Sequence, residues 1–332
     1  MTRTSKMRLC RWGLLIMLMF AAASHGAHGA FCDVPHGTDN IEWPRTDFAK
    51  CVIDPEEFLS GGPRRDDIAA IDEPLFAALA ETNLAPQAPL IALSVNGQTR
   101  GYPLAILMWH EIVNDVIGGV PVAVTYCPLC NAAIVFDRRH QGEILDFGTT
   151  GYLRHSDLVM YDRQSESWWQ QYDGRGLIGR FAGAVLKTLP SRLIGFGDFQ
   201  AAYENGTILQ PPQPPRRAYG ANPYIGYDSG FPVFFRGTVP DHIAPMARVV
   251  VVADRAWSFE YLAQHAPVHY QGLELTWSAG QASALDRRQV NDGRDVGSVR
   301  VTRQGQDVAH KVTFAFVVHA FEPQREIIHM RP

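Results

Sequence analysis

The sequence predicts an α/β protein of the α+β type, with β-rich mixed sheets and a few short helices. Short runs of β-branched and aromatic residues recur between Gly- and Asn-containing breaks, for example at 91–95 and 120–125. Helical periodicity is confined to brief segments, such as the one that follows Pro103. The 332 residues, 46% of them hydrophobic, are enough to bury a large core.

Local signals predict the elements of the first half in order. Residues 91–95 predict a strand, Asn96-Gly97 a tight hairpin turn, and 99–102 the returning strand. Pro103 suits the first turn of a helix, and the apolar spacing predicts that this helix extends to Asn114. Further strands are predicted at 120–125, 132–137, 144–148, 158–161 and 168–172.

The second half repeats this order of elements. A strand is predicted from Arg248, a helix after Ser258 and another strand at 273–277. Leu285-Asp-Arg-Arg echoes Phe136-Asp-Arg-Arg, and Ser-Ala-Gly-Gln stands where the first half has Cys-Pro-Leu-Cys. We interpret the chain as an internal duplication of a strand-helix-strand-hairpin unit, with chance similarity as the alternative.

Four segments are expected along the chain. The first is a signal peptide at 1–29, and an N-terminal arm with loops at 30–90 follows it. A first β-rich half at 91–209 then precedes a Pro-rich connector and a second half at 210–332. The run 311–318 reads as a strand that returns to earlier strands, so we expect the halves to pack as one domain.

The first 29 residues predict the compartment of the protein. Basic residues precede an apolar run at 12–23, and small residues surround Ala27, as in a secretory signal peptide. The run is shorter than the ~20 residues that cross a bilayer. We expect cleavage and a periplasmic or otherwise exported, secreted protein with no transmembrane span, with a retained N-terminal anchor as the alternative.

Charge and motifs exclude several functions. Without the four basic residues of the leader, the 30 Lys and Arg fall to 26 against 34 Asp and Glu, a formal charge of −8. Nucleic acid is therefore not an expected partner, because its binding depends on neutralising phosphates. No phosphate-binding loop, G-x-S-x-G or H-E-x-x-H motif occurs, so we expect no nucleotide cofactor and no standard hydrolase chemistry.

Cysteine usage separates two pairs. Cys10 lies in the leader, which leaves four cysteines in a compartment that permits disulfides. Cys32 and Cys51 enclose a short Pro-, Gly- and Asp-rich loop, and we predict that they form a structural disulfide. Cys127 and Cys130 are then left to each other or to a ligand.

Several motifs together resemble one known family. They are Trp109-His-Glu-Ile-Val-Asn-Asp, Thr125-Tyr-Cys-Pro-Leu-Cys-Asn, Phe147-Gly-Thr-Thr-Gly-Tyr-Leu-Arg, Leu158-Val-Met-Tyr-Asp-Arg and Trp168-Trp-Gln-Gln. In combination they resemble the domain-of-unknown-function 3179 family. The resemblance implies an exported, soluble or lipid-anchored bacterial protein of mixed α/β structure, and it implies no activity. His155 departs from the family pattern, in which Asn is more frequent.

The Cys127-x-x-Cys130 motif is the principal candidate site. Two thiolates with His110 form a ligand set suited to copper or zinc. Around them we expect a pocket lined by residues that fix a polar ligand or tune the metal: Glu111, Arg154, His155, Trp168 and Gln170. A metal ion or a small ligand is therefore the expected partner.

Two other interpretations of the motif remain open. In a thiol–disulfide redox protein, Cys127 would attack and Cys130 would resolve the mixed disulfide. The strand-like residues after Cys130 disfavour this interpretation, because a thioredoxin-type thiol needs a helix N-terminus. In a non-catalytic ligand-binding or interaction module, the motif would be a structural disulfide and His110 a packing residue. The sequence does not decide whether the protein is an enzyme.

Overall fold

The computed structural model describes residues 1–2, 42–215 and 217–330. The predicted signal peptide and Cys32 lie outside these residues, so the predicted cleavage and the Cys32–Cys51 disulfide are not described. Cys51 itself is half-buried and forms an isolated β-bridge with Ile178.

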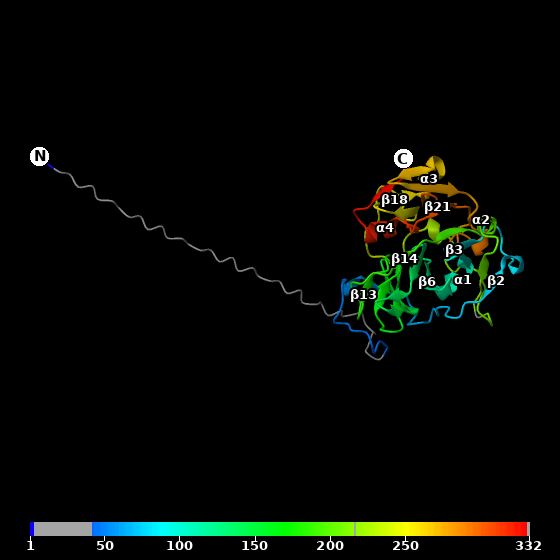
Figure 1. Cartoon of the computed structure of the whole chain (residues 1–332), viewed down its shortest axis with the longest axis horizontal. Helices are drawn as coiled ribbons and strands as arrows, with labels where there is room; N and C mark the ends of the chain where they lie inside the picture. The colour runs from blue at the N-terminus through cyan, green and yellow to red at the C-terminus, as the bar shows by residue number, and fades with distance from the viewer. Residues whose placement is uncertain (3–41, 216, 331–332) are drawn as a thin grey trace.

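The described chain is rich in short strands and has four α-helices, which confirms the predicted content (Figure 1). The helices are α1 (Leu104–His110), α2 (Phe196–Ala202), α3 (Phe259–His265) and α4 (Ala315–Phe321). Single 3-10 turns cover Pro55–Glu57, Leu79–Glu81, Tyr227–Ser229 and Val290–Asp292.

The strands between residues 58 and 209 form three larger sheets and one small ribbon. One has the order β15 (Arg192–Gly195), β3 (Pro89–Val95), β4 (Gln98–Pro103), β16 (Thr207–Leu209), β2 (Phe76–Ala78). The next has the order β14 (Thr188–Leu189), β7 (Ala132–Asp137), β6 (Val120–Cys127), β5 (Ile112–Ile117). The third has the order β1 (Phe58–Ser60), β10 (Phe147–Arg154), β11 (Asp157–Asp162), β12 (Trp168–Gln170), β13 (Gly176–Ile178).

The second half contributes two further sheets of four strands. One has the order β23 (Lys311–Phe314), β17 (Arg248–Val252), β18 (Arg255–Ser258), β24 (Glu326–Ile328). The other has the order β19 (Val268–Tyr270), β20 (Leu273–Ser278), β21 (Ser298–Arg303), β22 (Gln306–Asp307). A small ribbon of β8 (Arg139–His140) and β9 (Glu143–Ile144) completes the described strands.

The predicted hairpin at Asn96-Gly97 is present between β3 and β4, but the helix after it is shorter than predicted. Asn96 and Gly97 have φ of 50° and 80°, as a tight hairpin turn requires. Helix α1 ends at His110 and not at Asn114, because Glu111 adopts a left-handed φ of 58° and the chain continues as β5. Asn114 therefore lies on a strand.

The run 311–318 was predicted to be one strand, and this prediction is wrong in its second part. Strand β23 ends at Phe314, and helix α4 begins at the next residue. The expected return to earlier strands does occur: the amide nitrogen of Phe314 donates to the carbonyl of Cys130, 3.2 Å away.

Two sheets, one in each half, have the same connectivity. In both, a hairpin (β3–β4 or β17–β18) leads directly into a seven-residue helix. A later strand-helix-strand segment then pairs one strand antiparallel with the first strand of the hairpin and the other strand parallel with the second. The Asp-Arg-Arg echo does not occupy equivalent places. Asp137 ends β7, whereas Asp286 lies in the connection between β20 and β21.

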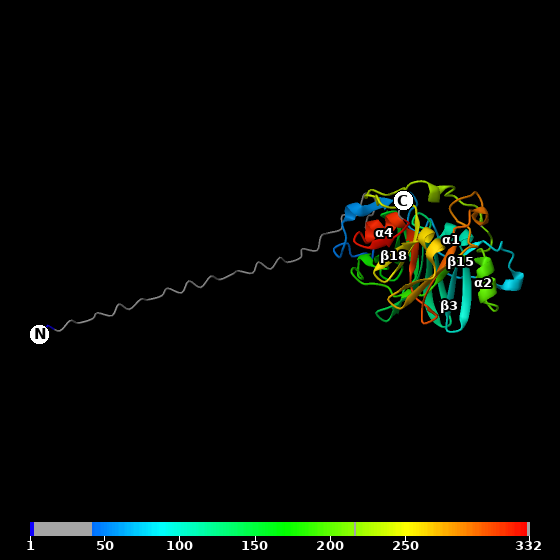
Figure 2. The same cartoon turned by 90° about the horizontal axis from the view of Figure 1, so that it is seen from above.

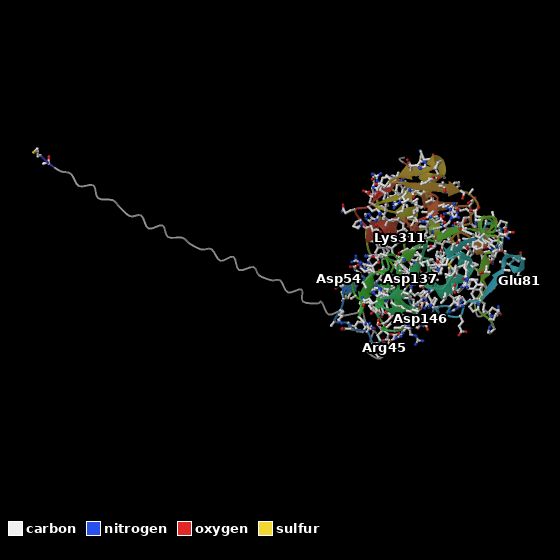
Figure 3. All side chains as sticks on the ribbon, viewed as in Figure 1. Arg45, Asp54, Glu81, Asp137, Asp146 and Lys311 are labelled. Carbon is white, nitrogen blue, oxygen red and sulfur yellow. The ribbon has the colours of Figure 1, made fainter. Side chains whose placement is uncertain are left out.

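One large hydrophobic cluster joins the two halves. It includes Leu107 and Val124 from the first half and Val250 and Phe314 from the second. In Figure 1 the second half, coloured yellow to red, lies above the cyan and green strands of the first, and Figure 2 shows the same arrangement from above. Charged side chains such as Arg45 and Glu81 lie at the periphery (Figure 3).

Candidate functional site

The two cysteines lie in the tight connection between β6 and β7. Cys127 is the last residue of β6, and Asn131, with φ of 49°, precedes β7. The amide nitrogen of Asn131 donates to the carbonyl of Pro128 at 3.2 Å. From the second half, the Thr313 hydroxyl donates to the Cys130 carbonyl at 2.9 Å. The turn is therefore fixed from both sides.

A carboxylate from another sheet completes a group of three ligand side chains. Asp157 begins β11, directly after a turn whose residues His155 and Ser156 have left-handed φ of 52° and 67°. One potential metal-ligand atom from each of Cys127, Cys130 and Asp157 lies within 4.8 Å of the other two. All three residues are buried.

The two carboxylate oxygens of Asp157 have different surroundings. Oδ1 accepts hydrogen bonds from Gln170 Nε2 at 2.6 Å and from the Tyr172 amide nitrogen at 2.8 Å. Oδ2 is buried and accepts no hydrogen bond from a described nitrogen or hydroxyl group. The thiol of Cys130 is the hydrogen-bonding neighbour of this carboxyl. Burial raises the pKa of the carboxyl to about 7. The carboxyl and the thiol of Cys130 therefore share one buried site.

Neither thiol is in a disulfide. Cys127 and Cys130 are free and only 1% and 0% exposed. Burial raises the pKa of the Cys127 thiol, and raises that of Cys130 well above its usual value. Both sulfurs are therefore protonated at neutral pH unless a cation binds them.

His110 is not part of this group. Its Nδ1 lies 2.7 Å from the carbonyl oxygen of Ala69, and its Nε2 lies 2.7 Å from the hydroxyl of Tyr219. The Tyr219 ring stacks on the imidazole at a centroid distance of 5.7 Å. Both ring nitrogens are thus engaged elsewhere, and the structure does not bring His110 to the thiols as predicted.

Glu111, the next residue, does face the region of the site. Its main chain bonds to Leu107 and Tyr126, at 2.7 Å and 2.8 Å. Its side chain, 8% exposed, lines a cavity of about 200 Å³. Burial and then the charge of Asp157 raise the pKa of the Glu111 carboxyl to about 8.

The other predicted pocket residues have varied roles. Gln170 holds Asp157, as described above. Arg154 Nη2 and His155 Nε2 both bind Glu57 Oε2, at 2.6 Å and 2.9 Å, so these two side chains form an ion-pair cluster beside the site. Trp168 is fully buried in an aromatic cluster and stacks on Tyr152. Its role is packing.

Sequence reasoning missed Asp157. Asp157 lies in the polar stretch Arg154-His-Ser-Asp. Its position just before a predicted strand was the only feature of the sequence that could have marked it as a site residue. Sequence reasoning also missed Tyr224. Burial and the charges of Glu111 and Cys127 raise the pKa of the Tyr224 hydroxyl, so this side chain lies near both residues.

Together these features define a class: a β-rich protein with a buried dithiol–carboxylate group beside a small cavity. The chain belongs to the DUF3179 family, described as proteins of unknown function, whose sequence profile matches residues 65–325. This match confirms the family resemblance of the motifs. No curated protein and no solved structure matches the chain. Within the described residues, no helix has the length and apolarity needed to cross a membrane.

Proposed function

We propose that the protein binds a zinc ion through Cys127, Cys130 and Asp157. The observation that carries this proposal is the close grouping of the buried Asp157 carboxyl with two free buried thiols. In a tetrahedral zinc site with bonds of about 2.3 Å, neighbouring sulfur atoms lie roughly 3.8 Å apart. The group, within 4.8 Å, reaches this geometry with small side-chain movements.

The ligand types favour zinc over copper. Copper(I) prefers soft sulfur ligands, whereas zinc accepts thiolate and carboxylate together. The third ligand of this group is a carboxylate oxygen. Three protein ligands leave a fourth position for water or another molecule, as in catalytic zinc sites. Zinc binding to the raised-pKa thiols would release protons.

The two alternatives for the thiols have less support. A structural disulfide would require bonded sulfurs, and these cysteines are free. Redox exchange requires an accessible thiolate, and burial opposes both accessibility and ionisation here. No α-helix begins at Cys130, which is followed by β7.

Elemental analysis of the zinc-equilibrated protein tests the proposal. We expect about one zinc ion per chain, and less than about a tenth of that when Cys127 and Cys130 are both replaced by Ser. His110→Gln is the matched control, because His110 is outside the group, and it is expected to keep full zinc content. Zinc loss in folded His110→Gln protein, or unchanged zinc in the double Ser variant, would contradict the ligand assignment.

We further infer that the protein is exported after cleavage of residues 1–29. The support is the basic, apolar and small-residue pattern of the leader. The N-terminal sequence of the protein recovered from the periplasm or culture medium tests it. A mature protein that begins at Met1 and stays in the cytoplasm would contradict it.

We also infer that the chain contains an internal duplication with one active copy. The supporting observation is the shared strand order of the sheets built on β3–β4 and β17–β18. In the first copy the segment after β7 is extended by β8–β13, which supply Asp157, and the second copy has no thiols in the corresponding connection. Superposition of the matching strands of the two copies tests this inference, and a different placement of α1 and α3, or of α2 and α4, on those strands would contradict it.

A further inference from the structure

A cavity beside the proposed zinc site is lined by apolar and aromatic residues and a single carboxyl group. Apolar residues such as Ile68, Leu153 and Leu158 line much of it. Tyr152, Tyr224 and Phe234 also line it. Glu111 is the one carboxyl among the described lining residues, and no Lys, Arg or His is among them.

The Glu111 carboxyl has no partner that compensates its burial. It makes no hydrogen bond and no ion pair with any described residue, although its side chain is only 8% exposed. The charge that acts on it, that of Asp157, repels its ionised form. In the empty cavity this carboxyl keeps its proton up to about pH 8, and a cation bound next to it favours the ionised form and releases that proton.

The backbone holds Glu111 in this place against local strain. A φ of 58° is unfavourable for a non-Gly residue with a long side chain. The main-chain hydrogen bonds to Leu107 and Tyr126 fix that conformation at the junction of α1 and β5. The carboxyl is therefore presented to the cavity by a rigid part of the fold.

Aromatic rings in the cavity provide a second group, besides Glu111, that attracts a cation. The face of an aromatic ring attracts cations, and aromatic rings with one carboxylate are suited to an alkylammonium group. The ring of Tyr152 stacks on Trp168 at a centroid distance of 5.2 Å, on the face of β10 opposite to Leu153, so the aromatic side chains available to the cavity are those of Tyr224 and Phe234. Tyr224 is partly buried, and Phe234, 44% exposed, lies at the rim.

We propose that this cavity binds a small organic cation, an alkylammonium compound, through Glu111 and the rings of Tyr224 and Phe234. The proposal goes beyond zinc binding and does not depend on it. The two sites are electrostatically compatible, because zinc with two thiolates and one carboxylate keeps a net negative charge that does not repel a neighbouring cation.

Calorimetric titration of the full chain, with and without added zinc, with choline and with tetramethylammonium tests the proposal. We expect saturable binding of at least one of these two cations. The uncharged isostere of choline, 3,3-dimethyl-1-butanol, is expected to bind at least about tenfold more weakly, because it lacks the charge. Equal binding of the neutral isostere, or no binding of either cation at millimolar concentration, would overturn the proposal.

Three variants locate the binding site. Glu111→Gln is expected to lower cation affinity at least about tenfold, whereas Glu56→Gln, which removes one exposed charge outside the cavity, is expected to leave it unchanged. Phe234→Ala, at the exposed rim, is expected to weaken binding about two- to fivefold without affecting the fold. Wild-type affinity in both folded Glu111→Gln and Phe234→Ala would overturn the assignment.

The cysteine variant separates this proposal from zinc binding. Replacement of Cys127 and Cys130 by Ser is expected to abolish zinc binding and to keep cation binding within about threefold of wild type. Glu111→Gln is expected to lose cation affinity and to keep normal zinc content. Loss of cation binding in the folded double Ser variant would show that the cavity does not bind cations independently, and this would overturn the proposal.

Discussion

At the scale of single residues, Asp157 is the ligand that favours zinc over copper in the proposed site. One of its oxygens is fixed by Gln170 and the Tyr172 amide, and the other is buried beside the Cys130 thiol. A carboxylate oriented in this way by neighbours is ready to bind a metal ion with little loss of entropy.

Asp157→Asn is therefore expected to weaken zinc binding at least about tenfold, because the amide is a poor zinc ligand. Competition with a chromophoric chelator measures the affinity. Asp241→Asn, at a fully exposed position, serves as the control and is expected to bind zinc normally. Equal affinity in the two variants would remove Asp157 from the ligand set.

Glu111 makes the stability of the metal-free protein depend on pH. Its carboxyl has an ordinary pKa of 4.5 and a pKa of about 8 in the folded protein. The folded state therefore binds the proton more tightly, so the contribution of Glu111 to stability is fully present below pH 4.5 and is lost as the pH rises through about 8. Glu111→Gln has no such proton to lose.

Between about pH 5 and about pH 9, the unfolding free energy of the wild type should fall more than that of Glu111→Gln. The expected difference between the two decreases is a few kcal/mol. Denaturant titration of both metal-free proteins at several pH values measures this difference. Parallel pH profiles would contradict the burial of an unpaired carboxyl at this position.

His155 occupies a backbone conformation that Asn also tolerates. It has φ of 52°, in the left-handed region that Asn adopts readily. His155→Asn is expected to change the free energy of unfolding by less than about 1 kcal/mol and to keep zinc content. His155→Val, which is β-branched, is expected to be destabilising at this φ. Equal stability of the two variants in urea titration would contradict this expectation.

At the scale of elements, the sequence predicted those with strong local signals. Asn96-Gly97 marks a hairpin because both residues tolerate positive φ. The end of α1 was missed because Glu111 adopts a left-handed conformation that its residue type does not signal. The apolar run 311–318 was assigned to one strand because short apolar runs do not separate strand from helix.

The candidate site was predicted only in part, for a similar reason. The spacing of Cys127 and Cys130 is enough to place two sulfurs in one turn. Asp157 comes from another sheet, and its position depends on the pairing of β10 with β11 and on the packing between sheets. His110 is close to the motif in sequence, but its ring points to Ala69 and Tyr219.

Strand β23 connects the second half to the site. The hydroxyl of Thr313 and the amide nitrogen of Phe314 both donate to the carbonyl of Cys130. Thr313→Val removes one of these bonds with little change in shape, so we expect a loss of about 1 kcal/mol in unfolding free energy and a zinc affinity a few-fold lower. Unchanged stability and zinc affinity in calorimetry would show that β23 does not support the turn.

At the scale of the whole molecule, the chain combines a scaffold of two halves with one specialised site. The large hydrophobic cluster takes residues from both halves, while the thiols and Asp157 come from the first half alone. The candidate site is thus held by packing that extends across the molecule, and its two thiols and carboxyl are all buried.

X-ray absorption at the zinc edge of the zinc-loaded protein tests the central claim most directly, because it reports the atoms bound to the metal. We predict two sulfur neighbours at about 2.3 Å and one or two oxygen neighbours at about 2.0 Å. The oxygens belong to Asp157 and to a water or another molecule at the open position. A zinc shell without sulfur, or one that contains the imidazole of His110, would contradict the account.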